Sequence, residues 1–378
     1  MIVNKAPMGW NTWNTFGPNI NEKIIMEAAD AMVEKGLLDA GYEYLVIDDC
    51  WALKQRDPVT RRLVADPEKF PNGMKAVADY VHSKGLKFGM YSCAGVRTCG
   101  DYPGSFDHEF IDAETFAEFG IDFLKYDYCY RSSVTAGPIL YHRMANALRA
   151  TGRDIVFSAC NWGKDDVYSW IRSTGAHLYR STGDIFDNFP RMKEIASSQF
   201  DKQCYNTPGC YNDMDMLTVG MFGKGHVGTE GCTAEDYKIQ FGLWCMLGSP
   251  LMLGCDIRDI DDESLKLVKN EHLIAINQDI EGRQTFQITS KSWACYDVAT
   301  FVRKLENGDF ALGVFNFADR AATVVVLFDE IGYPANCGLK FELTDCFTGE
   351  KSVCDADSLS LYVESRGTKI YRVKPVKR

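Results

Sequence analysis

Long apolar runs and a surplus of positive charge are both missing from this 378-residue sequence. No stretch approaches the roughly 18 or more apolar residues that a membrane-spanning helix needs. The 41 Lys and Arg residues are outnumbered by 52 Asp and Glu residues, which gives a net charge of −11. This charge repels a phosphate backbone or an anionic membrane. We therefore expect no nucleic acid and no membrane partner, and a neutral substrate fits better.

The usual signatures of metal and phosphate sites are missing as well. The six histidines form no HxH or HExxH pair, and the 14 cysteines include no CxxC motif, although such spacings are typical of zinc sites. No glycine-rich loop carries the lysine of a P-loop. We therefore expect neither a metal nor a cofactor, and we interpret each lone histidine as structural.

The first residues, MIVNKAPMGWN, lack the apolar core of a secretory leader and continue into a predicted strand. Cysteines spread through so long a chain are expected to be mostly reduced and buried. Together these two observations predict a cytoplasmic protein. The sequence leaves the oligomeric state open, with a homo-oligomer as one alternative.

Residues 1–284 repeat one pattern, a short apolar strand followed by an amphipathic helix. Asn21, for example, is predicted to cap a helix that runs to about residue 38. Eight such units, with polar residues collecting after the strands, predict a (β/α)8 TIM barrel of the α/β class. The strands are predicted near 7–12, 42–51, 86–93, 121–130, 154–162, 176–184, 204–217 and 250–256.

Residues 285–378 follow a different pattern. Short alternating segments, such as DFALGVFNFA at 309–318 and AATVVVLF at 321–328, are separated by turn signals such as ENGD. Segments of this kind without a helical period predict an antiparallel β-sandwich. We therefore predict two domains, a catalytic barrel at 1–284 and a C-terminal antiparallel β domain at 285–378.

The predicted strand at 121–130, IDFLKYDYCY, carries two opposite charges near its end. Side chains alternate between the faces of a strand, so Lys125 and Asp127 share one face with Phe123. Burying a cation and an anion costs free energy unless they serve each other or a ligand. Barrels place their chemistry at the C-terminal ends of the strands. Asp127 is therefore a candidate catalytic group, with a structural ion pair as the alternative.

Other predicted strands also end in carboxylates. Like charges raise some carboxyl pKa values while cations lower others, so one carboxylate can attack while another donates a proton. A two-carboxylate hydrolase follows, and aromatic faces near the same strand ends suit a sugar ring. The charged residues are Asp48, Asp49, Lys125, Asp127, Arg180, Asp184 and either Asp213 or Asp215. The aromatic residues are Trp10, Trp13, Trp51, Tyr91, Tyr128 and Trp162, of which we assign Trp10 to the core but Trp13 and Trp51 to the pocket.

Two other interpretations stay open at this point. An acid-rich barrel mouth can hold Mg²⁺, although a lysine and an arginine among the acids argue against it. A carbohydrate-binding protein without catalytic activity would show the same spacing of residues.

Eight segments resemble one family in order and along the whole predicted barrel. They are MGWNTW at 8–13, YLVIDDCW at 44–51, KFGMYS at 87–92, FLKYDYCY at 123–130, CNWG at 160–163, RSTGD at 180–184, YNDMDML at 211–217 and AINQD at 275–279. The sequence resembles glycoside hydrolase family 27, the α-galactosidases and α-N-acetylgalactosaminidases. This resemblance implies a retaining glycosidase with a catalytic barrel followed by an antiparallel β domain.

The resemblance also implies roles for individual residues. Asp127 matches the nucleophile that forms a covalent glycosyl-enzyme, and Asp184 matches the general acid/base. In a retaining pair the two carboxyl groups lie about 5–5.5 Å apart. Cys99 and Cys129 match a pair beside the active site that is disulfide-bonded in secreted members, a bond that we leave open in a reducing compartment. The matching sugar-contacting positions are Trp13, Asp48, Asp49, Tyr91, Lys125, Arg180 and Asp215.

The CNWG segment bears on the choice of sugar. Members acting on N-acetylgalactosamine need small residues near the sugar's 2-position. We expect Asn161 to hydrogen-bond a 2-hydroxyl and Trp162 to leave no space for an acetamide. The resemblance therefore implies exo-acting hydrolysis of terminal α-D-galactosyl residues, with α-N-acetylgalactosaminidase and β-L-arabinopyranosidase as alternatives. The choice of galactoside is expected to depend on long loops such as 55–72.

Overall fold

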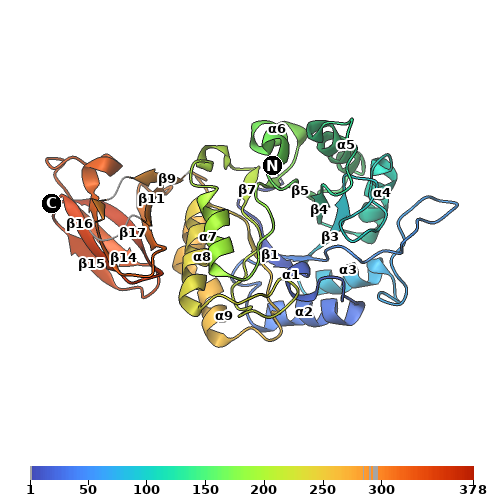
Figure 1. The fold of residues 1–378 in the computed structure, drawn as a ribbon, viewed down its shortest axis with the longest axis horizontal. Helices are drawn as coiled ribbons and strands as arrows, with labels where there is room; N and C mark the ends of the chain where they lie inside the picture. Colours follow the sequence, from blue (N-terminus) through green and yellow to red (C-terminus); the bar gives the residue numbers. More distant parts are fainter. Residues whose placement is uncertain (1, 284, 289–290, 293–296) are drawn as a thin grey trace.

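The computed structural model describes residues 2–283, 285–288, 291–292 and 297–378. A barrel of strands surrounded by helices is followed by a smaller β domain beside α7 and α8 (Figure 1). Both parts were predicted from the sequence, and both are confirmed. Among the described residues, no helix is long and apolar enough to cross a membrane.

Eight parallel strands form the barrel in the order β7-β6-β5-β4-β3-β2-β1-β8. A parallel bridge between Leu217 and Leu253 connects the segment after β7 to β8 and completes the ring. The C-terminal ends of the strands therefore meet at one rim. The strands are β1 (Met8–Asn11), β2 (Tyr44–Val46), β3 (Lys87–Cys93), β4 (Phe123–Asp127), β5 (Val156–Cys160), β6 (Leu178–Arg180), β7 (Tyr211–Asp213) and β8 (Leu251–Leu253).

Helices cover the outside of the ring. Asn21 caps α2 as predicted, because its side-chain oxygen accepts a hydrogen bond of 3.0 Å from the Ile24 amide. Two short helices, α1 and α10, were not predicted, and α1 places Trp13 directly after β1. The helices are α1 (Trp13–Phe16), α2 (Glu22–Glu34), α3 (Met74–Ser83), α4 (Glu109–Phe119), α5 (Gly137–Ala150), α6 (Val167–Thr174), α7 (Phe189–Ser197), α8 (Ala234–Leu247), α9 (Asp262–Val268) and α10 (Glu271–Asn277).

Strand β4 shows how the barrel sorts its side chains. Leu124 and Tyr126 are fully buried in the cluster between the strands and the outer helices. Phe123 belongs to a separate apolar cluster with side chains of five other barrel strands. Lys125 and Asp127 follow Phe123 on the same face, so the alternation predicted for this strand is confirmed. The apolar layer therefore forms a floor, and the charged side chains lie above it.

The β domain contains two antiparallel sheets around its own apolar core. Their orders are β10-β13-β16 and β15-β14-β17-β12-β11-β9. Helix α8 lies against the larger sheet, and Gly242 permits this approach because a Cβ there would be 2.6 Å from Cδ1 of Ile370. The strands are β9 (Thr285–Ile288), β10 (Lys291–Ser292), β11 (Val298–Lys304), β12 (Phe310–Asn316), β13 (Ala322–Leu327), β14 (Leu339–Asp345), β15 (Lys351–Cys354), β16 (Ser358–Val363) and β17 (Gly367–Lys377).

Candidate active site

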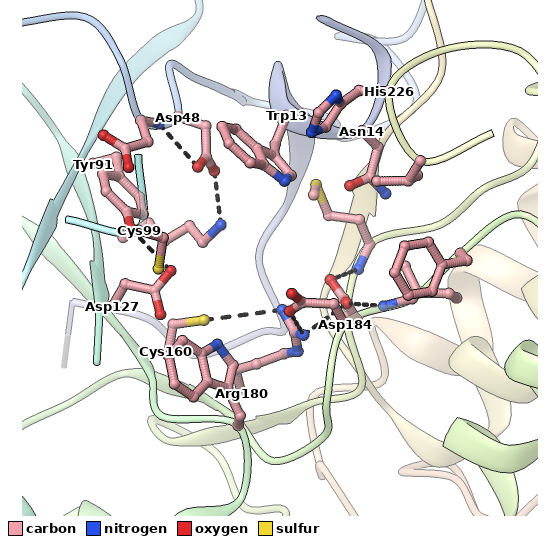
Figure 2. Close-up of a pocket in the computed structure, with 18 residues that line it drawn as sticks. Trp13, Asn14, Asp48, Tyr91, Cys99, Asp127, Cys160, Arg180, Asp184 and His226 are labelled. Carbon is pink, nitrogen blue, oxygen red and sulfur yellow. Dashed lines mark hydrogen bonds and ion pairs between the residues drawn. The ribbon is translucent and has the colours of Figure 1, made fainter. Parts of the chain in front are cut away.

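A cavity of about 260 Å³ lies where the barrel strands end. Figure 2 shows its side chains, with Asp127 and Asp184 on different sides of the space between them. The lining residues are Trp13, Asn14, Asp48, Asp49, Tyr91, Cys99, Lys125, Asp127, Cys160, Trp162, Arg180, Asp184, Ile185, Phe186, Asp215, Met216, His226 and Val227.

Lys125 is held by the first of the two aspartates that follow β2. Its ammonium group lies 2.7 Å from Oδ2 of Asp48, which also accepts a hydrogen bond of 2.8 Å from Asn11. Burial opposes the charged form of Lys125, but the charge and hydrogen bond of Asp48, together with the nearby charge of Asp127, raise the lysine pKa. Asp49 accepts hydrogen bonds from the amides of Cys50 and Gly100, both at 2.7 Å. Burial raises the pKa of Asp49.

Asp127 is a buried carboxylate without a direct cation partner among the described residues. It is 6% exposed and accepts hydrogen bonds from the Tyr128 amide at 2.9 Å and the Tyr91 hydroxyl at 3.1 Å. Burial raises the pKa of Asp127 to about 6, although the charge of Lys125 opposes this change. The carboxylate therefore changes its charge close to neutral pH.

Asp184 has the opposite environment. Its side chain is 69% exposed and forms an ion pair of 2.6 Å with Arg180, which also lies 2.8 Å from Asp215. Burial by the surrounding pocket works against ionisation, but the Arg180 guanidinium outweighs it and holds the pKa of Asp184 below its usual range. Burial raises the pKa of Asp215 to about 6 despite the same guanidinium. The pocket thus gives its facing carboxyl groups different pKa values, and without a ligand the higher pKa belongs to Asp127 rather than to Asp184.

The nonpolar surfaces of the pocket include an aromatic wall and a disulfide. Trp13, Tyr91 and Trp162 line it from the ends of β1, β3 and β5. Cys99, another lining residue, is bonded to Cys129, with Cα atoms 5.2 Å apart. Within the described residues, Cys99, Asp127 and Cys129 have the spacing of a metal site, but the disulfide occupies both sulfur atoms.

Comparison with known proteins adds an independent line of information. A family model described as alpha galactosidase A matches residues 5–279, and one described as the alpha galactosidase C-terminal beta sandwich domain matches residues 296–373. An α-galactosidase from Cyamopsis tetragonoloba is 40% identical over 98% of this chain and 86% of its own length. The chain belongs to the α-galactosidase A family. The resemblance to glycoside hydrolase family 27 is therefore confirmed.

Solved structures of the family have the same architecture. α-Galactosidase I from Mortierella vinacea superimposes with a TM-score of 0.90 at 33% identity, over 98% of this chain and 97% of that one. The Saccharomyces cerevisiae α-galactosidase with raffinose gives a TM-score of 0.88 at 27% identity, over 99% and 98% of the two chains. Fold and family therefore extend over both parts of the molecule.

Several residues predicted for the family site lie elsewhere. Asn161 is fully buried behind the wall, where its amide donates to the Lys164 carbonyl at 2.8 Å, because the chain turns after Cys160 so that Trp162 faces the pocket. Cys129 is absent from the lining, although it bonds to Cys99. Trp51 is 3% exposed, packs on Phe116 and Phe119, and donates to the Tyr91 carbonyl.

Two further expectations also need correction. Tyr128 points outward and donates a hydrogen bond of 2.7 Å to Asp165. Residues 55–72 contribute nothing to the lining, since part of this loop extends away from the barrel and part packs near the loop around Tyr102. The remaining predicted contacts, including Asp215 rather than Asp213, line the cavity.

Seven lining residues were not predicted from the sequence: Asn14, Cys160, Ile185, Phe186, Met216, His226 and Val227. His226, which was interpreted as structural, lines the cavity. It lies in the segment between β7 and α8, which has no helical or strand period that could have placed it. Phe186 had one usable signal, its position two residues after Asp184.

Asp187 fixes this irregular segment to the acid-bearing loop. The residue is fully buried, and its carboxylate accepts hydrogen bonds from the Gly223 amide at 2.6 Å, the Cys232 amide at 3.3 Å and the Tyr237 hydroxyl at 3.0 Å. Its backbone amide donates to the Val227 carbonyl at 3.1 Å. The two loops therefore form one rigid part of the pocket wall.

Asp187→Ala is expected to lower the free energy of unfolding by about 2–4 kcal/mol, because several buried donors lose a charged acceptor. Tyr237→Phe removes one donor to Asp187 and the acceptor of the Phe222 amide, and is expected to cost about 1–2 kcal/mol. Urea denaturation monitored by tryptophan fluorescence measures both. A smaller loss for Asp187→Ala than for Tyr237→Phe would contradict the central place of the carboxylate.

Proposed function

We propose that the protein is a retaining, exo-acting α-galactosidase that removes terminal α-D-galactosyl residues from oligosaccharides or glycoconjugates. One observation carries the proposal: a buried carboxylate, Asp127, and an exposed, cation-paired carboxylate, Asp184, face the same small pocket. At about 260 Å³, the cavity is smaller than the range typical of drug-sized ligands, so it suits a single terminal sugar. The relative with raffinose supports an α-galactosyl oligosaccharide as the class of substrate.

In the first step, Oδ of Asp127 attacks the anomeric carbon while Asp184 gives its proton to the glycosidic oxygen. A bond forms between Asp127 and the sugar, the glycosidic bond breaks, and the aglycone leaves as an alcohol. Tyr91 is suited to stabilise the attacking carboxylate, because its hydroxyl already donates to Asp127. We expect the two carboxyl groups to act at a separation of about 5–5.5 Å.

In the second step, Asp184 removes a proton from water, and the water oxygen displaces Asp127 from the anomeric carbon. Two inversions give net retention, and Asp184 ends protonated for the next cycle. In the empty pocket, the ion pair with Arg180 favours the ionised, basic form of Asp184. A bound aglycone covers this exposed carboxylate, and burial raises a carboxyl pKa. Substrate binding therefore favours the acid form that the first step requires.

The polar wall is suited to galactose. Asp48 and Asp49 present carboxylate oxygens to sugar hydroxyls, Lys125 presents a donor, and Trp13 offers an aromatic face. Trp162, rather than Asn161, limits the space beside Cys160. This arrangement favours a sugar with a 2-hydroxyl over one with an acetamide. The alternative activities are α-N-acetylgalactosaminidase and β-L-arabinopyranosidase, and a panel of the corresponding substrates would reveal either one.

Azide separates the two carboxylate roles. We expect Asp127→Ala to lose at least about 10³-fold in kcat/KM. With an activated aryl α-galactoside as substrate, azide takes the place of the missing carboxylate and attacks the anomeric carbon, which yields β-galactosyl azide. Asp184→Ala still forms the covalent ester, so azide yields α-galactosyl azide, and melibiose hydrolysis falls about 10²–10⁴-fold. The anomer is assigned by the NMR coupling at the anomeric proton. The opposite anomers would reverse our assignment.

The pH profile tests the environment of Asp127. α-Galactosyl fluoride needs no proton for its leaving group, so its kcat/KM depends on ionised Asp127 and is expected to fall as the pH drops below about 6. The pKa of Asp215 lies in the same range, so the fall of kcat/KM at low pH reports both carboxyl groups of the pocket together. An ordinary aspartate, with a pKa of about 3.9, would keep its activity to about pH 4. A flat profile down to about pH 4.5 is incompatible with a buried nucleophile.

A further inference from the structure

The lining residues divide into two sets. Those assigned above to the galactosyl ring and its chemistry come mainly from the ends of β1 to β6. The second set begins beside Asp184 and continues into the segments after β7, with Phe186 and His226 as its two ring-bearing members. Since the general acid protonates the oxygen that joins galactose to its aglycone, residues next to Asp184 are in position to meet the aglycone.

Phe186 leaves an aromatic surface open in this part of the wall. It follows Asp184 by two residues, lines the cavity and is 44% exposed. No ring contact is recorded between Phe186 and the other aromatic side chains of the described chain. A large apolar ring at the mouth of a polar pocket offers a face for the C–H side of a second sugar.

His226 is seated more firmly than its exposure suggests. Its ring meets Trp13 edge-on, with centroids 5.0 Å apart, and a Cβ on Gly17 would lie 2.7 Å from the imidazole. Its backbone amide also donates to the Thr15 carbonyl at 3.0 Å. No described side chain or carbonyl is recorded as hydrogen-bonding the ring nitrogens. The imidazole is thus held in place with ring nitrogens that can hydrogen-bond a ligand.

The backbone that carries both rings is organised before a ligand arrives. Asp187, next to Phe186, binds the amides of Gly223 and Cys232 on either side of His226. The Val227 amide also donates to the Asn14 carbonyl at 3.1 Å. A surface that is already ordered loses little conformational entropy when it binds.

From this geometry we propose that Phe186 and His226 form an aglycone subsite that recognises a neutral pyranose. This inference rests on the proposed α-galactosidase function and adds the class of leaving group. The phenyl ring stacks on the apolar face of the aglycone sugar, and the imidazole hydrogen-bonds one of its hydroxyl groups. The preferred substrates are therefore galactosyl oligosaccharides, and the specificity residues lie after β6 and β7 rather than at 55–72.

Two substrates with the same galactosyl group test the subsite. Melibiose places glucose in it, whereas α-galactosyl fluoride leaves it empty, and kcat/KM for both reports the step that forms the glycosyl-enzyme. For Phe186→Ala we expect the melibiose-to-fluoride ratio of kcat/KM to fall about tenfold, as expected from loss of ring stacking. We expect His226→Ala to lower the ratio about fivefold, and His226→Gln, which keeps a hydrogen-bonding group, to restore part of it.

Phe222→Ala is the matched control. Phe222 lies in the same irregular segment and is 43% exposed, but it packs on Tyr237 and is absent from the cavity lining. For Phe222→Ala we expect the same melibiose-to-fluoride ratio of kcat/KM as for the unchanged protein. Phe186→Leu keeps a large apolar side chain and removes only the ring, so it separates loss of the ring from loss of side-chain volume. An unchanged ratio for Phe186→Ala, or an equal fall for Phe222→Ala, overturns the subsite. If the unchanged protein cleaves neither melibiose nor α-galactosyl fluoride, the α-galactosidase function itself is overturned.

Discussion

The pocket depends on pairing two cations, Lys125 and Arg180, with carboxylates directly above the apolar layer inside the barrel. Arg180 is buried and Lys125 is largely buried, and each charge would be costly to bury alone. Asp48 compensates Lys125, whereas Asp184 and Asp215 share Arg180. Burial raises the pKa of Asp127, and no described cation pairs directly with it to cancel this rise. The ion pairs that make the pocket stable therefore also create the difference between its two key carboxylates.

The barrel was predictable because its residues obey local rules. The Asn21 cap, the alternation along 121–127 and the change of pattern after about residue 284 all arise from short-range geometry. Helix α1 is only one turn long, and β6 and β7 each span three residues. Elements this short are defined by neighbouring strands and hydrogen bonds, so a local sequence pattern carries little information about their bounds.

The site was predictable to the extent that it follows strand ends. Asp48, Asp127 and Arg180 extend apolar strands, so the barrel rule alone brings them together. Asn161 and Trp162 were both expected to face the sugar, but only Trp162 does, because it adopts a positive φ of 59° and turns into the pocket while Asn161 is buried. The φ angle of one residue decides which of two neighbouring side chains faces a ligand, and the spacing of residues in the sequence does not reveal that angle. The cytoplasmic location stays a prediction, and the Cys99–Cys129 bond is more typical of an oxidising compartment.

The division of the pocket wall explains why one part was found from the sequence and the other was not. The residues proposed to recognise galactose are charged groups at strand ends, where the geometry of the barrel fixes their positions. The surface around Phe186 and His226 is formed by loops that tertiary hydrogen bonds to Asp187 hold together. Loops tolerate substitution and insertion more readily than the strands they connect. With Asp187 as its anchor, the proposed aglycone surface can change in sequence without disturbing the carboxylates at the strand ends.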